Sequence, residues 1–182
     1  ESPGKHPRIS KKAGGRGALD ATTDRAQIEA WWARWPHANI GLATGPSGLV
    51  VLDVDGPEGA RQLTEVSGGV IPPTLTVRTG RDGGYHLYYE GRGIPQSQRK
   101  GEHLDVRGSS GYVVAPPSLH ASGRRWEFID QLVPIAPVPQ WVGPWVKSRG
   151  RKDAGPENHT ALPVRPDAVR PAPARGRRDG CG

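Results

Sequence analysis

Methionine is absent from the 182 residues, including position 1, and cysteine occurs once, as Cys181. A single cysteine excludes an internal disulfide framework and a cysteine-based zinc site. No run of 18 apolar residues predicts a transmembrane helix, and no apolar N-terminal segment is typical of a signal peptide. These absences predict a cytoplasmic protein without a membrane partner. Its first residue is then either a processed end or not the natural start.

Basic residues outnumber acidic residues by seven, but the excess is uneven along the chain. Residues 148–182 hold 8 Arg or Lys and 4 Asp or Glu, and they are rich in proline, glycine and alanine. They contain no aromatic residue and no periodicity. We therefore predict a folded domain over residues 1–147 and a disordered basic tail over residues 148–182. The basic balance favours a polyanionic partner without choosing nucleic acid over a membrane surface.

Apolar spacing and turn residues predict a mixture of helices and strands. Three tryptophans recur at helical spacing after Asp24, and we expect them to pack in the core rather than to stack on bases. A second helix is expected over residues 57–66. Strands are expected over 39–44, 48–54, 74–78, 85–89, 103–107, 112–115 and 125–129. Because a Gly-Pro-Ser-Gly turn joins the first two strands, we expect them to form a hairpin.

Two acidic residues end the most apolar strand. Residues 49–52 predict a buried strand, and Asp53 and Asp55 follow it, separated by one residue. Strand side chains alternate between faces, so both carboxylates are expected on one face, about 6–7 Å apart. Carboxylates that repel each other call for a positive partner, and a hard divalent cation is the usual one. A strand end whose acids face water explains the same pattern.

A histidine and a third acid add to this pair. His86 lies on an expected strand, two residues after a pair of glycines, and Asp105 lies on another expected strand. Three carboxylates can hold two Mg²⁺ or Mn²⁺ ions about 3.5–4 Å apart, which is what polymerising nucleotidyl transfer requires. A histidine beside them can donate a hydrogen bond to a phosphate oxygen. The same acids with water as the nucleophile would make a nuclease.

The chain resembles the N-terminal domain of bifunctional DNA primase–polymerases, in the archaeo-eukaryotic primase superfamily. The resemblance extends in order from Gly4 to Trp141. Its matching segments are Gly4-Lys5-His6-Pro7, Trp31-Trp32, Asn39–Gly45, Gly48–Asp55, Thr79–His86 and Leu104–Ser118. It implies an α+β fold in which an RRM-like primase catalytic core is joined to a small additional α/β unit. It also implies that Asp53, Asp55 and Asp105 are the catalytic, metal-binding acids and that His86 contacts the phosphates of the nucleotide.

Further candidates for nucleotide binding come with alternatives. Arg107 shares a strand face with Asp105, so it is expected either to contact a phosphate or to form a salt bridge with that acid. Ser109 and Ser110 lie between glycines, where backbone N–H groups could face a triphosphate or form an ordinary hairpin turn. Basic residues at 5 and 81 could bind template or phosphate, although a solvated side chain is favoured at position 5.

The implied function is DNA-templated nucleotidyl transfer, as primer synthesis or DNA polymerisation in replication. It needs a DNA template and primer, dNTP or NTP, and Mg²⁺ or Mn²⁺. No Walker A pattern follows, so a helicase would be a separate partner. Because the chain begins almost at the Gly4 segment, the domain is expected to lack the family's N-terminal elements. A truncated, non-catalytic nucleic-acid-binding module and a metal-dependent nuclease stay open as alternatives.

Overall fold

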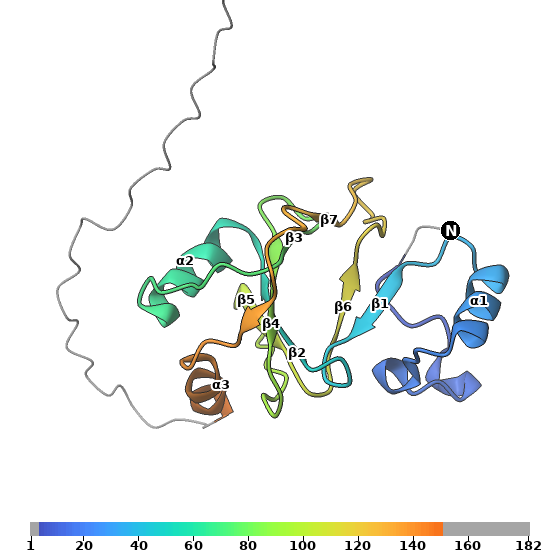
Figure 1. The fold of residues 1–182 in the computed structure, drawn as a ribbon, viewed down its shortest axis with the longest axis horizontal. Helices are drawn as coiled ribbons and strands as arrows, with labels where there is room; N and C mark the ends of the chain where they lie inside the picture. The colour runs from blue at the N-terminus through green and yellow to red at the C-terminus, as the bar shows by residue number, and fades with distance from the viewer. Residues whose placement is uncertain (1–3, 151–182) are drawn as a thin grey trace, which may run out of the picture. The chain divides into compact units, whose positions relative to one another are not determined.

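The computed structural model describes residues 4–150, and residues 1–3 and 151–182 lie outside the described part. Helices and strands alternate irregularly along the chain (Figure 1). The helical elements are the 3₁₀ turns η1 (Lys11–Ala13) and η2 (Gly17–Asp20) and the α-helices α1 (Arg25–Arg34), α2 (Gly56–Ser67) and α3 (Val142–Gly150). The strands are β1 (Ile40–Ala43), β2 (Leu49–Val54), β3 (Thr76–Arg78), β4 (Tyr85–Glu90), β5 (Leu104–Arg107), β6 (Tyr112–Ala115), β7 (Glu127–Phe128) and β8 (Ala136–Pro137). The mixed helix and strand content that the sequence predicted is therefore confirmed.

The larger sheet is built around β2. Its strands follow the order β5-β2-β4-β3-β7, all antiparallel, and β8 adds a parallel pairing with β4. Strand β2 therefore has a neighbour on each side, with Asp53 opposite His86 of β4 and opposite Asp105 of β5. This register brings three distant parts of the sequence to one position across the sheet.

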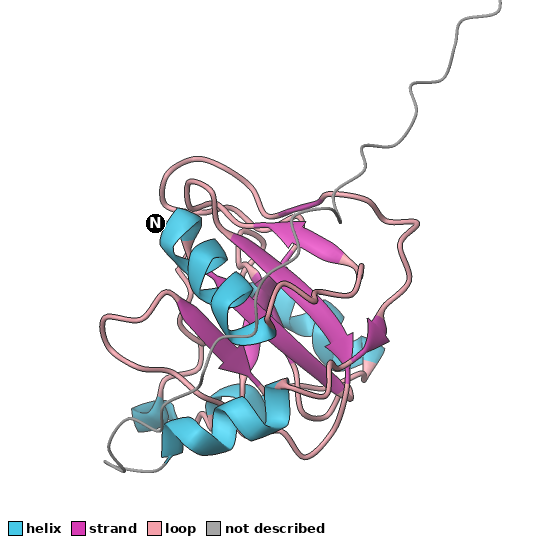
Figure 2. Ribbon diagram, turned by 90° about the vertical axis from the view of Figure 1, so that its left-hand side faces the viewer, coloured by secondary structure: helices cyan, strands magenta, loops and turns pink. Residues whose placement is uncertain are grey.

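Side chains of β2 alternate between two hydrophobic clusters, one on each face of this sheet. Val50, Leu52 and Val54 join a cluster with residues of α2 and α3. Val51 joins a second cluster with β6 and with Trp126. Figure 2, viewed from the side of α2 and α3, shows these helices in front of the strands. Because Asp53 is two residues after Val51, it shares the face of the second cluster, which lies between the two sheets.

The smaller sheet consists of β1 and β6, paired antiparallel. The predicted hairpin between residues 39–44 and 48–54 is therefore wrong, since β1 and β2 belong to different sheets. The turn itself exists, because the N–H of Gly48 donates to the carbonyl of Gly45 at 3.0 Å. A Cβ added at Gly45 would overlap the carbonyl oxygen of Ser109, so this glycine lets the turn pass close to the loop before β6.

Helices α1 and α2 begin and end close to where the sequence predicts. The carboxylate of Asp24 accepts hydrogen bonds from the N–H groups of the first turn of α1. Gly68, with φ of 61°, ends α2 in the left-handed conformation that favours glycine. The prediction of core packing fails for α1, however, because none of its residues is buried. Its two tryptophans, Trp31 and Trp32, line a cavity instead, together with Trp35 just after the helix.

Helix α3 covers the larger sheet near the end of the described chain. Trp141 and Trp145 pack against the cluster shared with α2, as expected for residues that close the core. The helix continues to Gly150, so the first three residues of the predicted tail are helical, and residues 151–182 lie outside the described part. Within residues 4–150, no helix combines the length and the apolar character needed to cross a bilayer.

Candidate active site

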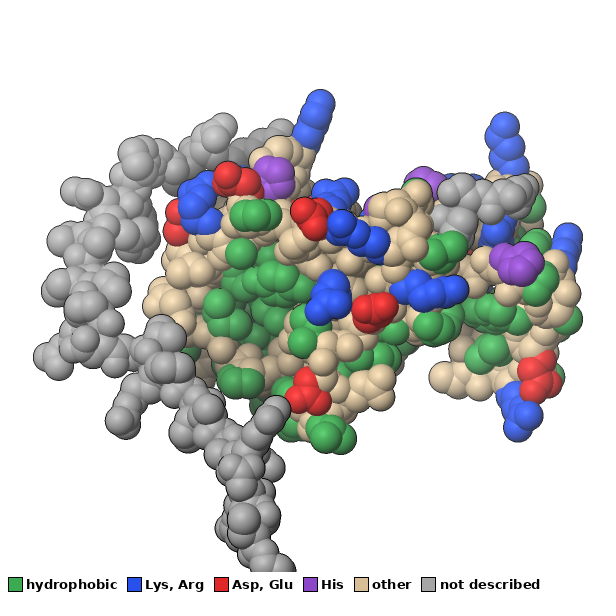
Figure 3. All heavy atoms as spheres, turned by 90° about the horizontal axis from the view of Figure 1, so that it is seen from above, with side chains coloured by type: hydrophobic (Ala, Val, Ile, Leu, Met, Phe, Trp, Pro, Cys, Tyr) green, Lys and Arg blue, Asp and Glu red, His purple; other side chains and the backbone are tan. Residues whose placement is uncertain are grey.

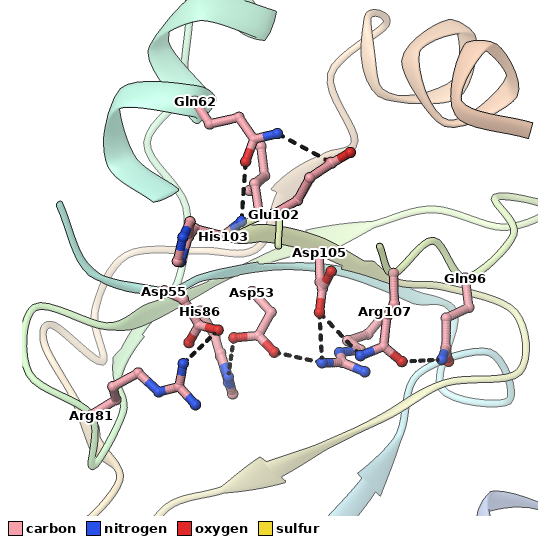
Figure 4. Close-up of polar contacts among 12 residues, drawn as sticks. Asp53, Asp55, Gln62, Arg81, His86, Gln96, Glu102, His103, Asp105 and Arg107 are labelled. Atoms are coloured by element: carbon pink, nitrogen blue, oxygen red, sulfur yellow. Dashed lines mark hydrogen bonds and ion pairs between the residues drawn. The ribbon is translucent and has the colours of Figure 1, made fainter. Parts of the chain in front are cut away.

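Asp53 lies at the centre of a row of polar side chains on one face of the larger sheet (Figure 4). Its Oδ1 lies 3.3 Å from Nε2 of His86, its neighbour on β4. Its Oδ2 accepts a hydrogen bond from Nη2 of Arg107 at 2.9 Å. Only 17% of the Asp53 side chain is exposed. The carboxylate is therefore held between two nitrogen groups from the strands on either side of it.

Arg107 joins two of the predicted acids. The same Nη2 atom lies 3.1 Å from Oδ2 of Asp105, so one guanidinium nitrogen bridges Asp53 and Asp105. Gln98 also donates to Oδ2 of Asp105, at 3.0 Å. The salt-bridge alternative for Arg107 is thus what the structure contains, and it extends to both acids. A cation already sits where the two carboxylates converge.

Burial and charge act in opposite directions on these two acids. Burial tends to raise the pKa of Asp53, but the hydrogen bond and charge of His86, together with Arg107, hold that pKa well below its usual range. Burial is the largest cause for Asp105 and raises its pKa, although Gln98 and Arg107 oppose the shift. Oδ1 of Asp105 is buried without a hydrogen-bond partner among residues 4–150. Asp53 is therefore the firmly ionised member of the pair, and Asp105 is the one that lacks solvation.

Asp55 lies one residue beyond the end of β2 and is the residue that precedes α2. Its backbone N–H donates to the carbonyl of His103 at 2.8 Å. Its carboxylate pairs with Arg81, from the glycine-rich loop between β3 and β4, at 2.9 Å. The second acid of the pair thus has a guanidinium of its own, separate from Arg107.

A pocket of about 310 Å³ opens in front of this row. Five of the predicted site residues line it: Asp53, Asp55, His86, Arg107 and Ser110. Asp105 and Ser109 are not in its lining. The hydroxyl of Ser109 donates to the carbonyl of Ile94 at 2.9 Å, so that serine holds a turn. The structure therefore separates the two serines and turns only Ser110 toward the pocket.

Other residues of the pocket were missed or undervalued in the sequence. Trp126 lines the pocket and is 2% exposed, and its indole N–H has no partner among the described residues. Lys5 lines the pocket too, with Nζ 5.5 Å from the centre of the Trp126 ring. Gln98 comes from the polar loop before β5. No sequence spacing could have indicated Trp126, because it reaches the site through a long-range contact. Gln98 is only seven residues from Asp105 in the chain, and it meets that acid because the loop before β5 folds back along the strand.

The carboxylate oxygens of this site are of the type that binds a hard cation, but arginines hold them in their present arrangement. Two carboxylates converge on one nitrogen of Arg107, and Oδ1 of Asp105 has no hydrogen-bond partner among residues 4–150. Carboxylate oxygens are the ligands that Mg²⁺ and Mn²⁺ prefer. Across residues 4–150, however, no three His, Cys, Asp or Glu side chains are grouped as a metal site. A divalent cation would therefore have to displace Arg107 to reach both acids.

Comparison with models of protein families shows which family the chain belongs to. Residues 1–141 match the family model for the N-terminal domain of bifunctional DNA primase/polymerases, Prim-Pol. The chain belongs to the Prim-Pol family. The match includes every strand that carries a candidate site residue, and Prim-Pol membership points to a primase or polymerase role in DNA replication. No curated protein sequence gives a significant match. Prim-Pol proteins typically use divalent metal ions.

Proposed function

We propose that this Prim-Pol domain carries out DNA-templated nucleotidyl transfer, extending or starting a DNA primer. The observation that carries the proposal is the register across the larger sheet, which sets Asp53 opposite both His86 and Asp105. These are the residues that resemblance to primase–polymerases assigns to the catalytic centre. The pocket in front of them, of about 310 Å³, has room for the reacting part of a nucleotide.

Asp53, Asp55 and Asp105 would hold the divalent cations, Mg²⁺ or Mn²⁺. Bound there, such ions would lower the pKa of a primer 3′-hydroxyl and neutralise the triphosphate and the departing pyrophosphate. In the reaction, the 3′-hydroxyl loses its proton to solvent and its oxygen bonds to the α-phosphorus, while the bond from that phosphorus to the bridging oxygen breaks and pyrophosphate leaves. The chain's own contribution is to position the reactants and to supply fixed charge.

The arginines give the site its charge balance. Arg107 neutralises Asp53 and Asp105, and Arg81 neutralises Asp55, before any substrate enters. When a nucleotide arrives with its cations, both guanidinium groups can exchange a carboxylate for phosphate oxygens, which a guanidinium can bind through two N–H groups at once. We therefore expect metal and nucleotide to bind synergistically. The metal ions take over the carboxylates that the arginines leave, and the phosphates of the nucleotide take over the arginines.

His86 and Ser110 would complete the phosphate contacts. His86 is buried, and its Nδ1 has no hydrogen-bond partner among residues 4–150. An imidazole whose Nε2–H donates to Asp53 has a second N–H, on Nδ1, only when the ring is protonated, and in that form it can donate a hydrogen bond to a phosphate oxygen. Ser110 lines the same pocket at the turn before β6. Ser109 is left out of this proposal, since its hydroxyl is engaged with Ile94.

The finer description of the fold is also a proposal. We propose that the larger sheet with α2 and α3 is the RRM-like primase core, and that β1, β6 and α1 form the small additional unit. Together they would be the folded domain predicted over residues 1–147. A separate helicase as partner stays a prediction from the sequence.

A second function, binding of nucleic acid without catalysis, is favoured by one observation. The acids are held by arginines, and no metal-binding group of three is formed within the described residues. In that function the arginines would stay on the carboxylates permanently. Salt-sensitive DNA binding without incorporation is the expected behaviour.

Primer extension separates these functions. A labelled primer on a DNA template is incubated with the full chain, dNTPs and Mg²⁺ or Mn²⁺. Extension is expected with the unaltered protein and is expected to be lost in Asp53→Asn. The matched control is Asp82→Asn, because Asp82 is exposed and pairs only with Arg124 among the described contacts. No extension with either metal would favour the non-catalytic function, and a shortened primer would indicate a nuclease.

A further inference from the structure

A second cavity, of about 180 Å³, lies beside α1. Trp31, Trp32 and Trp35 line it, together with residues of β1 and β6 and the segment from Gly4 to Ile9. We call it the Trp cavity. All three tryptophans are only partly buried. An indole left in this state keeps apolar ring surface that gains free energy when another planar group covers it.

The chain that borders the Trp cavity is strongly basic. Residues 4–20 contain five Lys or Arg and one acidic residue, Asp20, which gives a net charge of +4. All five basic side chains are exposed: Lys5, Arg8, Lys11, Lys12 and Arg16. Figure 3 shows basic and hydrophobic side chains next to one another at this end of the molecule. Aromatic surface bordered by exposed positive charge is the combination that binds single-stranded nucleic acid.

The Trp cavity adjoins the candidate active site. Lys5, Ala18, Tyr112 and Val114 line both the cavity and the active-site pocket. The segment that contains Lys5 is fixed in place, since the hydroxyl of Tyr112 donates to the carbonyl of Lys5 at 2.8 Å. The ammonium of Lys5 lies over Trp126, on the active-site side. A nucleic-acid strand that leaves the active site toward the cavity would therefore pass a fixed positive charge.

We propose that the Trp cavity binds an unpaired base of single-stranded DNA, adjacent to the part of the strand that is being copied. This inference rests on the proposed function, which makes DNA the substrate. A stacked base explains the aromatic lining, and the phosphates next to it would meet the exposed basic side chains of this segment, of which Lys5 and Arg8 line the cavity. A DNA duplex would not fit, because its bases are already stacked on one another.

The test is a binding experiment that requires no catalysis. The full chain is titrated, without metal or nucleotide, into a fluorescent single-stranded oligonucleotide, and then into a series in which one nucleotide at a time is abasic. In the unaltered protein, one or two abasic positions are expected to weaken binding roughly tenfold. Trp32→Ala should weaken binding of intact DNA by a similar factor. In this variant, an abasic nucleotide at those positions should cause no further loss of affinity. Trp32→Phe keeps a stacking ring and should behave nearly like the unaltered protein.

Trp145→Ala is the matched control, since Trp145 is also partly buried on a helix but lies outside the Trp cavity. It should leave the abasic pattern unchanged. The proposal is overturned if no abasic position costs more than twofold in the unaltered protein, or if Trp32→Ala retains the full abasic penalty. Should Trp32→Ala fail to fold, the unaltered protein and Trp32→Phe decide alone. Primer extension is scored separately, so an inactive chain can still show the stacking site and an active chain can still lack it.

Discussion

Arg107 occupies the position that a divalent cation would need, and replacing it isolates that role. Arg107→Gln keeps much of the side-chain length but removes the charge that bridges Asp53 and Asp105. Both acids would then face each other with 17% of each side chain exposed. Removing one partner of a buried ion pair typically costs about 3–5 kcal/mol. The first expectation is therefore a large loss of folding stability.

Protonation of Asp105 limits that loss. Protonating an ordinary carboxyl group at pH 7 costs about 4 kcal/mol, and the pKa of Asp105 is already raised by burial. We therefore expect Arg107→Gln to lower the free energy of unfolding by about 2–4 kcal/mol at pH 7. In the variant the folded pKa of Asp105 rises further above its unfolded value. The folded state then binds more protons, so the variant loses stability as pH rises and its deficit shrinks toward pH 5.

Urea unfolding at pH 5 and pH 7, with and without MnCl₂, measures both effects. Manganese should stabilise Arg107→Gln more than the unaltered protein, because the ion no longer competes with a guanidinium for the two carboxylates. Arg124→Gln is the control, since it breaks an exposed pair with Asp82 and should change neither stability nor the manganese response. Equal stability of Arg107→Gln and the unaltered chain at pH 7, with equal manganese shifts, would refute the bridging role of Arg107.

Two further changes test the site and the turn beside it. Asp105→Asn should abolish primer extension. It should leave the free energy of unfolding at pH 7 unchanged or higher by about 1 kcal/mol, because a buried carboxylate with a raised pKa opposes folding above its unfolded pKa. A clear fall in stability would contradict this expectation. Gly45→Ala should cost about 1–3 kcal/mol and reduce incorporation, since its Cβ would push against the carbonyl of Ser109 and move the turn that carries Ser110. Gly41→Ala, whose Cβ would have an ordinary 3.8 Å contact, is the comparison, and equal effects at both glycines would contradict the overlap.

The local pattern of the sequence was enough to predict most strands and the first two helices. The structure of buried runs such as residues 49–52, and of glycine pairs such as Gly68-Gly69, is determined by residues that are adjacent in the sequence. Pairing between strands does not depend on neighbours in the same way. A Gly-Pro-Ser-Gly turn is compatible with a hairpin, but β1 finds its partner in β6, which is some 70 residues away. Helix α3 was missed because its short apolar pattern is interrupted by Gly143 and Pro144.

The candidate site was predicted as a set of residue types rather than as a geometry. Resemblance to a family supplied Asp53, His86 and Asp105, and the strand register brings them together. What the sequence could not contain is which atoms the arginines contact. A spacing of two residues put Arg107 on the face of Asp105, but only the pairing of β5 with β2 makes it a bridge to Asp53. The prediction that the tryptophans of α1 pack in the core was wrong, because helical spacing predicts an apolar stripe on the helix but not which other element packs against it.

The central place of β2 has a consequence for the lengths that this chain can tolerate. An insertion or deletion of one residue within β2 would rotate every later side chain of the strand to the opposite face. Asp53 would enter the cluster formed with α2 and α3, and Leu52 after an insertion, or Val54 after a deletion, would take its place beside His86. Chain-length variation among related sequences should therefore gather in connections such as residues 91–101, while the strand and its two neighbours keep a constant count.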